Sequence, residues 1–325
     1  MDALVDQSGR TARDLRISVT DRCNLRCAYC LPEDARSWAA RSDLLRADDV
    51  ARLVSIGLEV GIHDVRFTGG EPLLRPDLAD LIAAAAAEFD RAGLPRRIAL
   101  TTNAIGLDSR LDDLLAAGLG RINISLDTLD PDRFAALSRR RRLADVMAGL
   151  DAVAASSLGP VKVNTVIVDS TSLAEIPSLV DYCLARGWQW RAIELMPFGP
   201  LAETPGPTGD EILSALSAHV DLSPRAGDDP HAPARTYDVP GGTVGIIASM
   251  SSPFCHSCSR TRVSATGRVY PCLFSPLHVD VSEALRAGRD DEVKRLWREA
   301  TWNKPAGHPW LPTPGRAYSL SAIGG

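Results

Sequence analysis

The sequence predicts an α/β fold, a partial (β/α)6 barrel of the TIM type with a C-terminal appendage. Two observations predict it. Six short apolar runs alternate with helical stretches, which is typical of βα units and a parallel sheet. Within several of these runs, polar side chains occupy every second position. Successive side chains of a strand point to opposite faces, so these strands have one apolar and one polar face. Strands covered by helices on both faces are apolar on both. A barrel with a polar, ligand-holding interior therefore fits better than a doubly wound sheet.

The six expected strands follow one another along the first part of the chain, and they span residues 15–20, 64–68, 97–103, 121–127, 161–168 and 188–196. Helical stretches at residues 48–60, 77–91 and 172–186 lie between some of them. The expected inward-facing side chains are Arg16, Ser18 and Thr20 in the first strand, Arg66 and Thr68 in the second, Asn123, Ser125 and Asp127 in the fourth, and Lys162 and Asn164 in the fifth. In the sixth strand Arg191 and Met196 have opposite parity, so a bulge or the start of a loop is needed if both face inward.

A Pro- and Gly-rich stretch at residues 199–209 predicts a boundary. We therefore expect the barrel at residues 1–198 and a C-terminal region at 199–325. That region is expected to contain a short helix, a flexible Asp- and Pro-containing segment at 223–235, two or three strands near Cys255 and Cys272, and a helix at 281–299. It ends in Gly324-Gly325.

Composition narrows the class of protein. The 325 residues are 45% hydrophobic and 24% charged, with a net charge of −5, which is ordinary for a globular protein. A global basic excess, the usual mark of nucleic-acid or membrane-surface binding, is absent, so we expect neither partner. No apolar run approaches the ~20 residues of a membrane span. The first ten residues, MDALVDQSGR, contain no signal-peptide core, and a cytoplasmic location is expected.

The seven cysteines indicate metal rather than disulfides, because an odd number in a reducing compartment argues against a disulfide framework. The first group, Cys23, Cys27 and Cys30, follows the first expected strand, where active-site loops of barrels lie. Three thiolates can hold three irons of a [4Fe–4S] cluster and leave the fourth iron open. The alternative is zinc, but a structural zinc site needs four ligands, and no fourth Cys or His lies nearby in sequence.

The second group, Cys255, Cys258 and Cys272, leaves two interpretations open. It is either a zinc ribbon completed by His256 or His278, or a second [4Fe–4S] cluster with an open iron. Arg260 and Arg262 lie between its cysteines. Two arginines beside a metal suit the binding of phosphate oxygens, and the alternative is a solvated basic strand edge.

The C-x3-C-x2-C spacing, with Tyr29 before the last cysteine, resembles the signature of the radical S-adenosylmethionine (SAM) superfamily. Gly69-Gly70-Glu71-Pro72, after the second expected strand, is similar to the GGEP motif with which that superfamily binds the SAM amino group. The resemblance implies a partial barrel of six units. It also implies chemistry in which a reduced cluster cleaves SAM and a 5′-deoxyadenosyl radical abstracts hydrogen from a substrate.

The chain as a whole resembles the GTP 3′,8-cyclase family, also called the molybdenum cofactor biosynthesis protein A family, from about residue 13 to the end. Its matching segments are RDLRISVTDRCNLRCAYC (13–30), RFTGGEPL (66–73), TTN (101–103), RINISLD (121–127), VKVN (161–164), FCHSCSRTR (254–262), YPCLF (270–274) and the terminal Gly-Gly.

The resemblance implies a role for each matching position. Cys23, Cys27 and Cys30 carry the SAM cluster, and Cys255, Cys258 and Cys272 carry a second [4Fe–4S] cluster whose open iron contacts guanine. The SAM contacts are Tyr29, Gly70, Ser125 and Met196. The GTP-binding positions are Arg16, Arg66, Thr101, Lys162, Arg260 and Arg262, with Arg191 as an addition. The tail, Gly324-Gly325, reaches into the active site, and Arg260 and Arg262 assist the reduction step.

Several of these residues are charged side chains that the strand parity already turns inward. Burying Arg and Lys in a barrel is costly unless an anion pairs with them, so a polyanion such as GTP is also a physical expectation. In the reaction that the resemblance implies, hydrogen is taken from C3′ of the ribose and C3′ then bonds to C8 of guanine. A one-electron reduction and a proton give the cyclic dihydro-GTP product. The implied partners are an electron donor of the flavodoxin or ferredoxin type, the downstream cyclic pyranopterin monophosphate synthase, and a second copy of the chain in a homodimer.

Two other functions remain as alternatives. The first is a radical SAM enzyme that modifies a peptide or protein and carries an auxiliary cluster. The second is a non-catalytic metal-binding module with two zinc knuckles. Three further features receive structural interpretations. Cys183 is expected to be a small buried hydrophobe on a helix, the run Arg139 to Arg142 to be an exposed helix face or loop, and Trp188 and Trp190 to serve packing.

Overall fold

The computed structural model describes residues 3–35, 37–227, 229–307 and 320–324. Six parallel strands form the core of the barrel, each beside the next in chain order: β1 (Asp14–Ser18), β2 (Asp64–Thr68), β3 (Ile98–Thr102), β4 (Arg121–Ser125), β5 (Val161–Ile167) and β6 (Gln189–Glu194). Five lie within the ranges that the sequence predicts, and β1 begins one residue before its range. The prediction of a partial barrel is confirmed.

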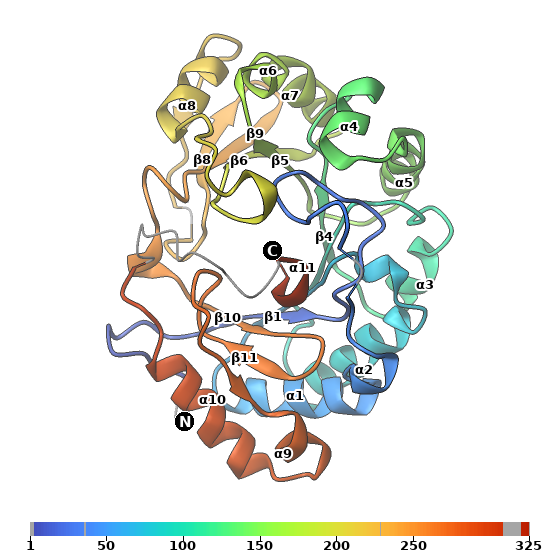
Figure 1. Cartoon of the computed structure of the whole chain (residues 1–325), viewed down its shortest axis with the longest axis vertical. Helices are drawn as coiled ribbons and strands as arrows, with labels where there is room; N and C mark the ends of the chain where they lie inside the picture. Colours follow the sequence, from blue (N-terminus) through green and yellow to red (C-terminus); the bar gives the residue numbers. More distant parts are fainter. Residues whose placement is uncertain (1–2, 36, 228, 308–319, 325) are drawn as a thin grey trace.

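Helices cover the outer face of this sheet, as Figure 1 shows, and the inner face encloses the centre of the molecule. They are α1 (Ala47–Glu59), α2 (Leu78–Arg91), α3 (Leu111–Ala116), α4 (Pro131–Ser138), α5 (Leu143–Ala155), α6 (Ser170–Ala174) and α7 (Ile176–Leu184). The prediction of a single helix at 172–186 is wrong in one respect, because this stretch forms two helices, α6 and α7. Pro177 lies in the first turn of α7, where the amide hydrogen that proline lacks would have no helical partner.

The C-terminal region extends the sheet at both edges. β10 (Arg260–Val263) pairs in parallel with β1, and β9 (Gly242–Ile247) pairs in parallel with β6. Antiparallel strands β11 (Arg268–Tyr270) and β12 (Val279–Asp280) continue one edge, and β8 (Arg235–Val239) and β7 (Ser223–Pro224) continue the other. The twelve strands thus form one sheet to which residues beyond 198 contribute on both sides.

The remaining helices also come from this region. They are α8 (Gly209–Ser217), α9 (Ser282–Arg286), α10 (Asp290–Trp302) and α11 (Leu320–Ile323). The stretch 281–299, predicted as one helix, contains two helices, α9 and α10. Gly288 lies between them with a φ of +73°, a conformation that interrupts an α-helix. Helix α11 lies inside the ring of strands, near the centre of Figure 1.

The alternation of side chains along the strands is confirmed. Leu15, Ile17, Val65 and Phe67 are fully buried against the helices, whereas Arg16 and Arg66 line the interior. β6 ends at Glu194, so Met196 lies in the loop after the strand and the difference in parity from Arg191 needs no bulge.

The residues given structural roles also behave as expected. Cys183 is fully buried on α7, and Trp190 is fully buried and donates from Nε1 to Thr165 Oγ1 at 2.9 Å. Arg140, Arg141 and Arg142 are exposed between α4 and α5. Among the described residues, no helix is long and apolar enough to cross a membrane.

Candidate active site

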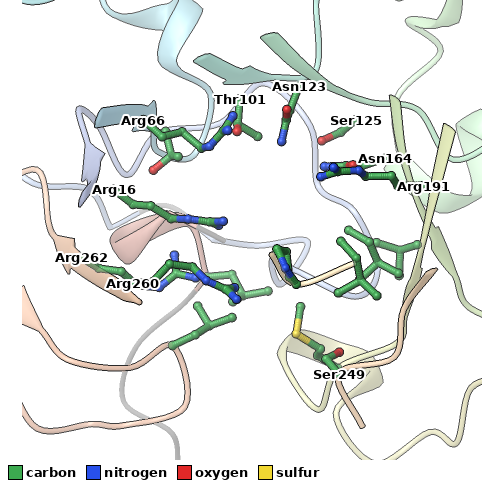
Figure 2. Close-up of a pocket in the computed structure, with 18 of the residues that line it drawn as sticks. Arg16, Arg66, Thr101, Asn123, Ser125, Asn164, Arg191, Ser249, Arg260 and Arg262 are labelled. Atoms are coloured by element: carbon green, nitrogen blue, oxygen red, sulfur yellow. The ribbon is translucent and has the colours of Figure 1, made fainter. Parts of the chain in front are cut away.

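A cavity of about 640 Å³ opens inside the barrel, and both cysteine groups line it. Side chains from all six core strands and from β10 reach it. Figure 2 shows Arg16, Arg66 and Arg260 extending into the same space from one side, and Arg191 from the other. The carboxyl ends of barrel strands are where loops and strand termini combine into ligand sites.

The first cysteine group lies in the loop after β1, and its three cysteines are half-buried. Burial raises the pKa of the Cys23 thiol to about 11 and that of Cys30 to about 12, and it also raises the pKa of Cys27. Neighbouring thiols raise these values further, so the three sulfurs are close enough to interact electrostatically. Thiols with such pKa values ionise when a metal displaces their protons. The donor set therefore fits a soft metal centre.

No group of three His, Cys, Asp or Glu side chains that could hold one metal ion is found in the part of the chain that the structure describes. A cube of iron and sulfide has each thiolate on a different iron, which needs a wider spacing than one zinc ion does. A cube therefore does not require the three sulfurs of a triad to converge on one point. His256 is exposed, and His278 Nδ1 lies 3.2 Å from the Pro276 carbonyl oxygen.

The loop after β2 holds the first cysteine loop in place. The Gly70 amide donates to the Thr20 carbonyl oxygen at 2.7 Å, and the Glu71 amide donates to that of Arg22, also at 2.7 Å. A Cβ at Gly70 would collide with the carbonyl oxygens of Arg22 and Asp21. Only glycine permits this approach of the two loops. Burial raises the pKa of Glu71 to about 7, although its carboxylate accepts from Asn103 N and Thr102 Oγ1 at 2.8 and 2.6 Å.

Asp127 lines the cavity and was not among the predicted site residues. Its Oδ2 accepts a hydrogen bond from the Tyr29 hydroxyl at 2.6 Å, and its Oδ1 accepts from Val166 N at 2.9 Å. Burial raises the pKa of this carboxyl. Tyr29 is thereby fixed beside the cysteines. The alternation along the fourth strand placed Asp127 inside the barrel, so a signal for it was available.

The second cysteine group lies in the part of the chain between β9 and β12. Cys255 and Cys258 flank a single helical turn (Cys255–Ser257), and Cys272 follows β11. Burial raises the pKa of the Cys258 thiol, but Arg260 and Lys304 together outweigh burial and lower this pKa to about 6. Burial raises the pKa of Cys272. A thiolate at Cys258 is therefore stabilised by fixed positive charge.

Three arginines form a row across adjacent strands. Arg16 on β1 is in register with Arg66 on β2 and with Arg262 on β10. Like charges at neighbouring positions of a sheet destabilise it. Burial and the neighbouring arginines lower the pKa values of Arg66 and Arg262 to about 9, and burial lowers that of Arg16.

This row and the neighbouring Arg260 have hydrogen-bonding capacity that the protein does not use. In the described residues, these buried nitrogen atoms have no hydrogen-bond partner: Arg16 Nε, Arg66 Nε and Arg66 Nη1 in the row, and Arg260 Nη2 beside it. Unpaired buried donors and buried like charges both cost free energy unless an anion joins them. The row thus has the donors and the charge to bind a polyanion such as a triphosphate.

The other predicted site residues lie on the same cavity. Thr101, Ser125, Lys162, Arg191 and Met196 line it, together with Tyr29 and Gly70. Arg191 donates from Nε to Gln189 Oε1 at 2.9 Å. Asn123 and Asn164 also line it and were missed as site residues, although the alternation along their strands placed both inside.

The end of the chain reaches the cavity. Leu320 and Ser321 of α11 line it, and Arg262 Nη1 donates a hydrogen bond to the Gly324 carbonyl oxygen. Gly324 has a φ of +73°, and a Cβ there would collide with the Thr68 side chain. Gly325, predicted to belong to the site, lies outside the described residues.

Comparisons with known proteins agree with this architecture. Residues 17–183 match the Radical SAM superfamily, and residues 188–310 match the Molybdenum Cofactor Synthesis C family. The GTP 3′,8-cyclase of Rhodococcus opacus is 46% identical over all of this chain and 94% of its own length. That of Corynebacterium glutamicum is 44% identical over 99% of this chain and 89% of its own, and GTP 3′,8-cyclase 2 of Mycobacterium tuberculosis is 44% identical over 99% and 92%.

Among solved structures, Streptococcus suis SuiB bound to S-adenosylmethionine has a TM-score of 0.61 at 15% identity, covering 91% of this chain and 69% of that one. SuiB bound to its precursor peptide SuiA has a TM-score of 0.53 at 15% identity, covering 81% and 60%. At this identity the likeness concerns the fold alone.

Proposed function

Because the chain belongs to the GTP 3′,8-cyclase family of the radical SAM superfamily, we propose that it converts GTP to (8S)-3′,8-cyclo-7,8-dihydro-GTP. This reaction is the first step of molybdenum cofactor biosynthesis. The observation that carries the proposal for this chain is the row of Arg66, Arg16 and Arg262, buried in one cavity with two cysteine triads. A peptide substrate would not require three adjacent buried cations, whereas a triphosphate would.

We propose that Cys23, Cys27 and Cys30 hold a [4Fe–4S] cluster with SAM on its open iron. Reductive cleavage of SAM at such a cluster supplies a carbon-centred radical that abstracts hydrogen from a substrate. The protein orients the reactants and excludes water. Tyr29, Gly70, Ser125 and Met196 line the cavity that this triad shares, which supports their proposed role as SAM contacts. Asp127 fixes the Tyr29 hydroxyl, so it orients one wall of this part of the site.

The GTP site that we propose consists of Arg16, Arg66, Thr101, Lys162, Arg260 and Arg262. Its arginines carry the unpaired donors described above, and guanidinium groups bind phosphate oxygens in pairs. Thr101 and Lys162 bring a hydroxyl and an ammonium from β3 and β5. We also propose that Arg260 and Arg262 assist the reduction step, because both lie beside the second triad. Gly324, held by Arg262, and Gly325 would close the site from the tail.

A second [4Fe–4S] cluster on Cys255, Cys258 and Cys272 is a further part of the proposal. The resemblance to the GTP 3′,8-cyclase family supports it, and Cys255, Cys258 and Cys272 line one cavity together with Arg260 and Arg262. Iron analysis tests it directly. Full-length protein reconstituted without oxygen should bind about eight irons. The variant that lacks the first triad should bind about half as many, and zinc in place of iron would exclude the second cluster.

We propose that a flavodoxin- or ferredoxin-type protein supplies the electron. The amides of Arg26 and Ala28, in the first cysteine loop, donate to the carbonyl oxygens of residues 138 and 137, immediately before the exposed arginines 140–142. This cationic stretch next to the first triad suits an acidic carrier. Slower reduction at high salt would support it, and a rate independent of salt would contradict it. A cytoplasmic location, a homodimer and a downstream cyclic pyranopterin monophosphate synthase complete the proposal on family grounds.

An anaerobic assay tests the whole proposal. The reconstituted protein receives dithionite, SAM and GTP, and mass spectrometry follows 5′-deoxyadenosine and a GTP-derived product. We expect both to appear together, and Cys23→Ala and Cys255→Ala each to abolish the product. Formation of 5′-deoxyadenosine with GTP intact would identify a radical SAM enzyme with another substrate, such as a peptide. A colourless protein that contains only zinc would identify a non-catalytic module.

A further inference from the structure

Two buried cations that do not line the cavity donate hydrogen bonds to the backbone of the second cysteine triad. Arg10 lies in the N-terminal turn, and Lys304 follows α10 near the other end of the chain. Their exposed fractions are 9% and 6%, so both are buried. Neither lines the cavity, and the functions proposed above use neither.

Arg10 contacts three segments of the chain, namely its own N-terminal turn, the start of the second triad, and residues 305–306. Its Nη1 donates to the Cys255 carbonyl oxygen at 2.6 Å and to that of Ala306 at 3.1 Å, and its Nη2 donates to that of Pro305 at 2.7 Å. Asp6 accepts from Arg10 Nε at 2.6 Å and neutralises its charge. The planar fork of donors makes this contact geometrically specific. Arg10 therefore ties the start of the second triad to the root of the C-terminal tail.

Lys304 differs from Arg10 in its charge balance. Its Nζ donates to the carbonyl oxygens of Cys258 and Arg260, each at 2.8 Å. Among the described residues, Lys304 forms no ion pair with a carboxylate, unlike Arg10, which is paired with Asp6. A buried ammonium without a counter-ion is costly. The two hydrogen bonds of Lys304 place this positive charge against the backbone of the second triad.

These contacts also reach the tail. Gly324, which follows α11, is held to the same unit because Arg262 on β10 donates to its carbonyl oxygen. The second triad, the root of the tail and its end are thus joined through Arg10, Lys304 and Arg262. A shift of the triad would be transmitted to the tail, and the reverse.

We propose that Arg10 and Lys304 are positioning residues for the second triad and the tail, and that the Lys304 ammonium raises the reduction potential of the cluster that the triad holds. The second part rests on the proposed second cluster. A fixed positive charge favours the reduced, more negative form of a nearby cluster, whereas Arg10, already paired with Asp6, contributes position and little net charge.

The experiment uses the full-length chain with Cys23, Cys27 and Cys30 replaced by alanine, so that the measured signal comes from the second cluster alone. Lys304→Met, Lys304→Arg, Arg10→Lys and the control Lys294→Met are compared in this background. Lys294, on α10, pairs with Glu59 at 2.6 Å, so its replacement removes an equal charge away from the triad. A redox titration followed by electron paramagnetic resonance gives the midpoint potential. Hydrogen exchange with mass spectrometry follows the segments 255–263 and 320–324.

We expect Lys304→Met to shift the midpoint potential to a more negative value, and Lys304→Arg to restore it. Amides of both segments should exchange roughly tenfold faster in Lys304→Met, as expected for lost bonds from a buried charged donor. Arg10→Lys, which cannot span three carbonyl groups, should accelerate exchange and leave the potential near that of the parent. Lys294→Met should change neither quantity.

The outcomes separate this inference from the function on which it rests. If the parent with only the second triad binds no iron, the proposed second cluster is wrong, and faster exchange in Lys304→Met and Arg10→Lys still tests the positioning role. If the cluster forms and Lys304→Met has the potential of Lys294→Met, the electrostatic role is wrong. If neither Lys304→Met nor Arg10→Lys changes exchange in either segment, the positioning role is overturned.

Discussion

Arg262 donates a hydrogen bond to the carbonyl oxygen of Gly324, which joins the end of the chain to a strand at the edge of the barrel. Arg262 is itself in register with Arg16, in the row of arginines that we assign to the triphosphate. One guanidinium therefore lies between the substrate site and the tail. Loss of this guanidinium would remove a contact from both sites.

The first prediction concerns Gly324. Two effects disfavour a side chain at this position: the positive φ of 73° would be strained for a residue other than glycine, and a Cβ would collide with the Thr68 hydroxyl. We expect Gly324→Ala to lower kcat roughly five- to thirtyfold, the rate equivalent of about 1–2 kcal/mol of backbone strain. Adding Thr68→Ala should restore part of the rate, because it removes the collision and leaves the strain. Unchanged turnover in Gly324→Ala would show that the tail has no part in catalysis.

The second prediction concerns Arg66. We expect Arg66→Met to weaken GTP binding by roughly ten- to a hundredfold, the usual loss for a charge-assisted contact. The same change should leave the melting temperature of the substrate-free protein equal or higher, because it removes a buried charge with two unpaired nitrogens. Calorimetry measures both quantities. Arg295→Met, on the exposed face of α10, is the control and should change neither. Lower stability with normal GTP affinity would make Arg66 a structural residue.

The third prediction is a pH dependence. Burial and neighbouring arginines lower the pKa values of Arg66 and Arg262 to about 9 in the folded protein. Unfolded arginine keeps its proton to far higher pH, so the unfolded state binds more protons above that value and the penalty for burying charge is fully present below it. Binding of a polyanion requires the protonated forms.

We therefore expect the rise in melting temperature caused by GTP to shrink from about pH 8 to about pH 10, as the two arginines lose protons in the free site. Thermal unfolding with and without GTP across this range measures it. In Arg66→Met the decrease should be smaller. A stabilisation by GTP that stays constant across the range would contradict the assignment of these arginines to the phosphates.

The sequence predicted the centre of the site better than its surroundings. Alternation along the strands placed Arg16, Arg66 and Lys162 inside the barrel, because side-chain direction is a local property of a strand. The two cysteine spacings predicted which cysteines share a site for a similar reason, since the members of each triad are close in sequence, and all six line the cavity. These features need no knowledge of the tertiary fold.

Other features depend on pairing between distant segments. That β10 joins β1 and β9 joins β6 follows from closure of the sheet, and no short-range pattern records it. Arg10 and Lys304 were missed because their distant partners are backbone carbonyl groups, which leave no residue type to recognise, and Asp6 is only a local partner of Arg10. The breaks between α6 and α7 and between α9 and α10 depend on single Pro and Gly residues within otherwise helical patterns.

The last prediction concerns Gly70, where two loops meet. Its amide bonds to Thr20, and a Cβ would be forced against the carbonyl oxygens of Arg22 and Asp21. Since backbone atoms cannot move aside as a flexible side chain can, we expect Gly70→Ala to displace the first cysteine loop and to destabilise the protein by about 1–3 kcal/mol. Gly120→Ala is the matched control, because its Cβ would meet only the Ile98 carbonyl oxygen at 3.6 Å, an ordinary contact.

Iron content distinguishes this displacement from a general loss of stability. After anaerobic reconstitution, Gly70→Ala should lose about half of its iron, that of the first triad, and keep the second cluster. Cys23→Ala should show the same spectrum, because both changes remove the same site. If Gly70→Ala binds the full complement of iron and only SAM affinity falls, the loop is a cofactor contact and does not position the cysteines.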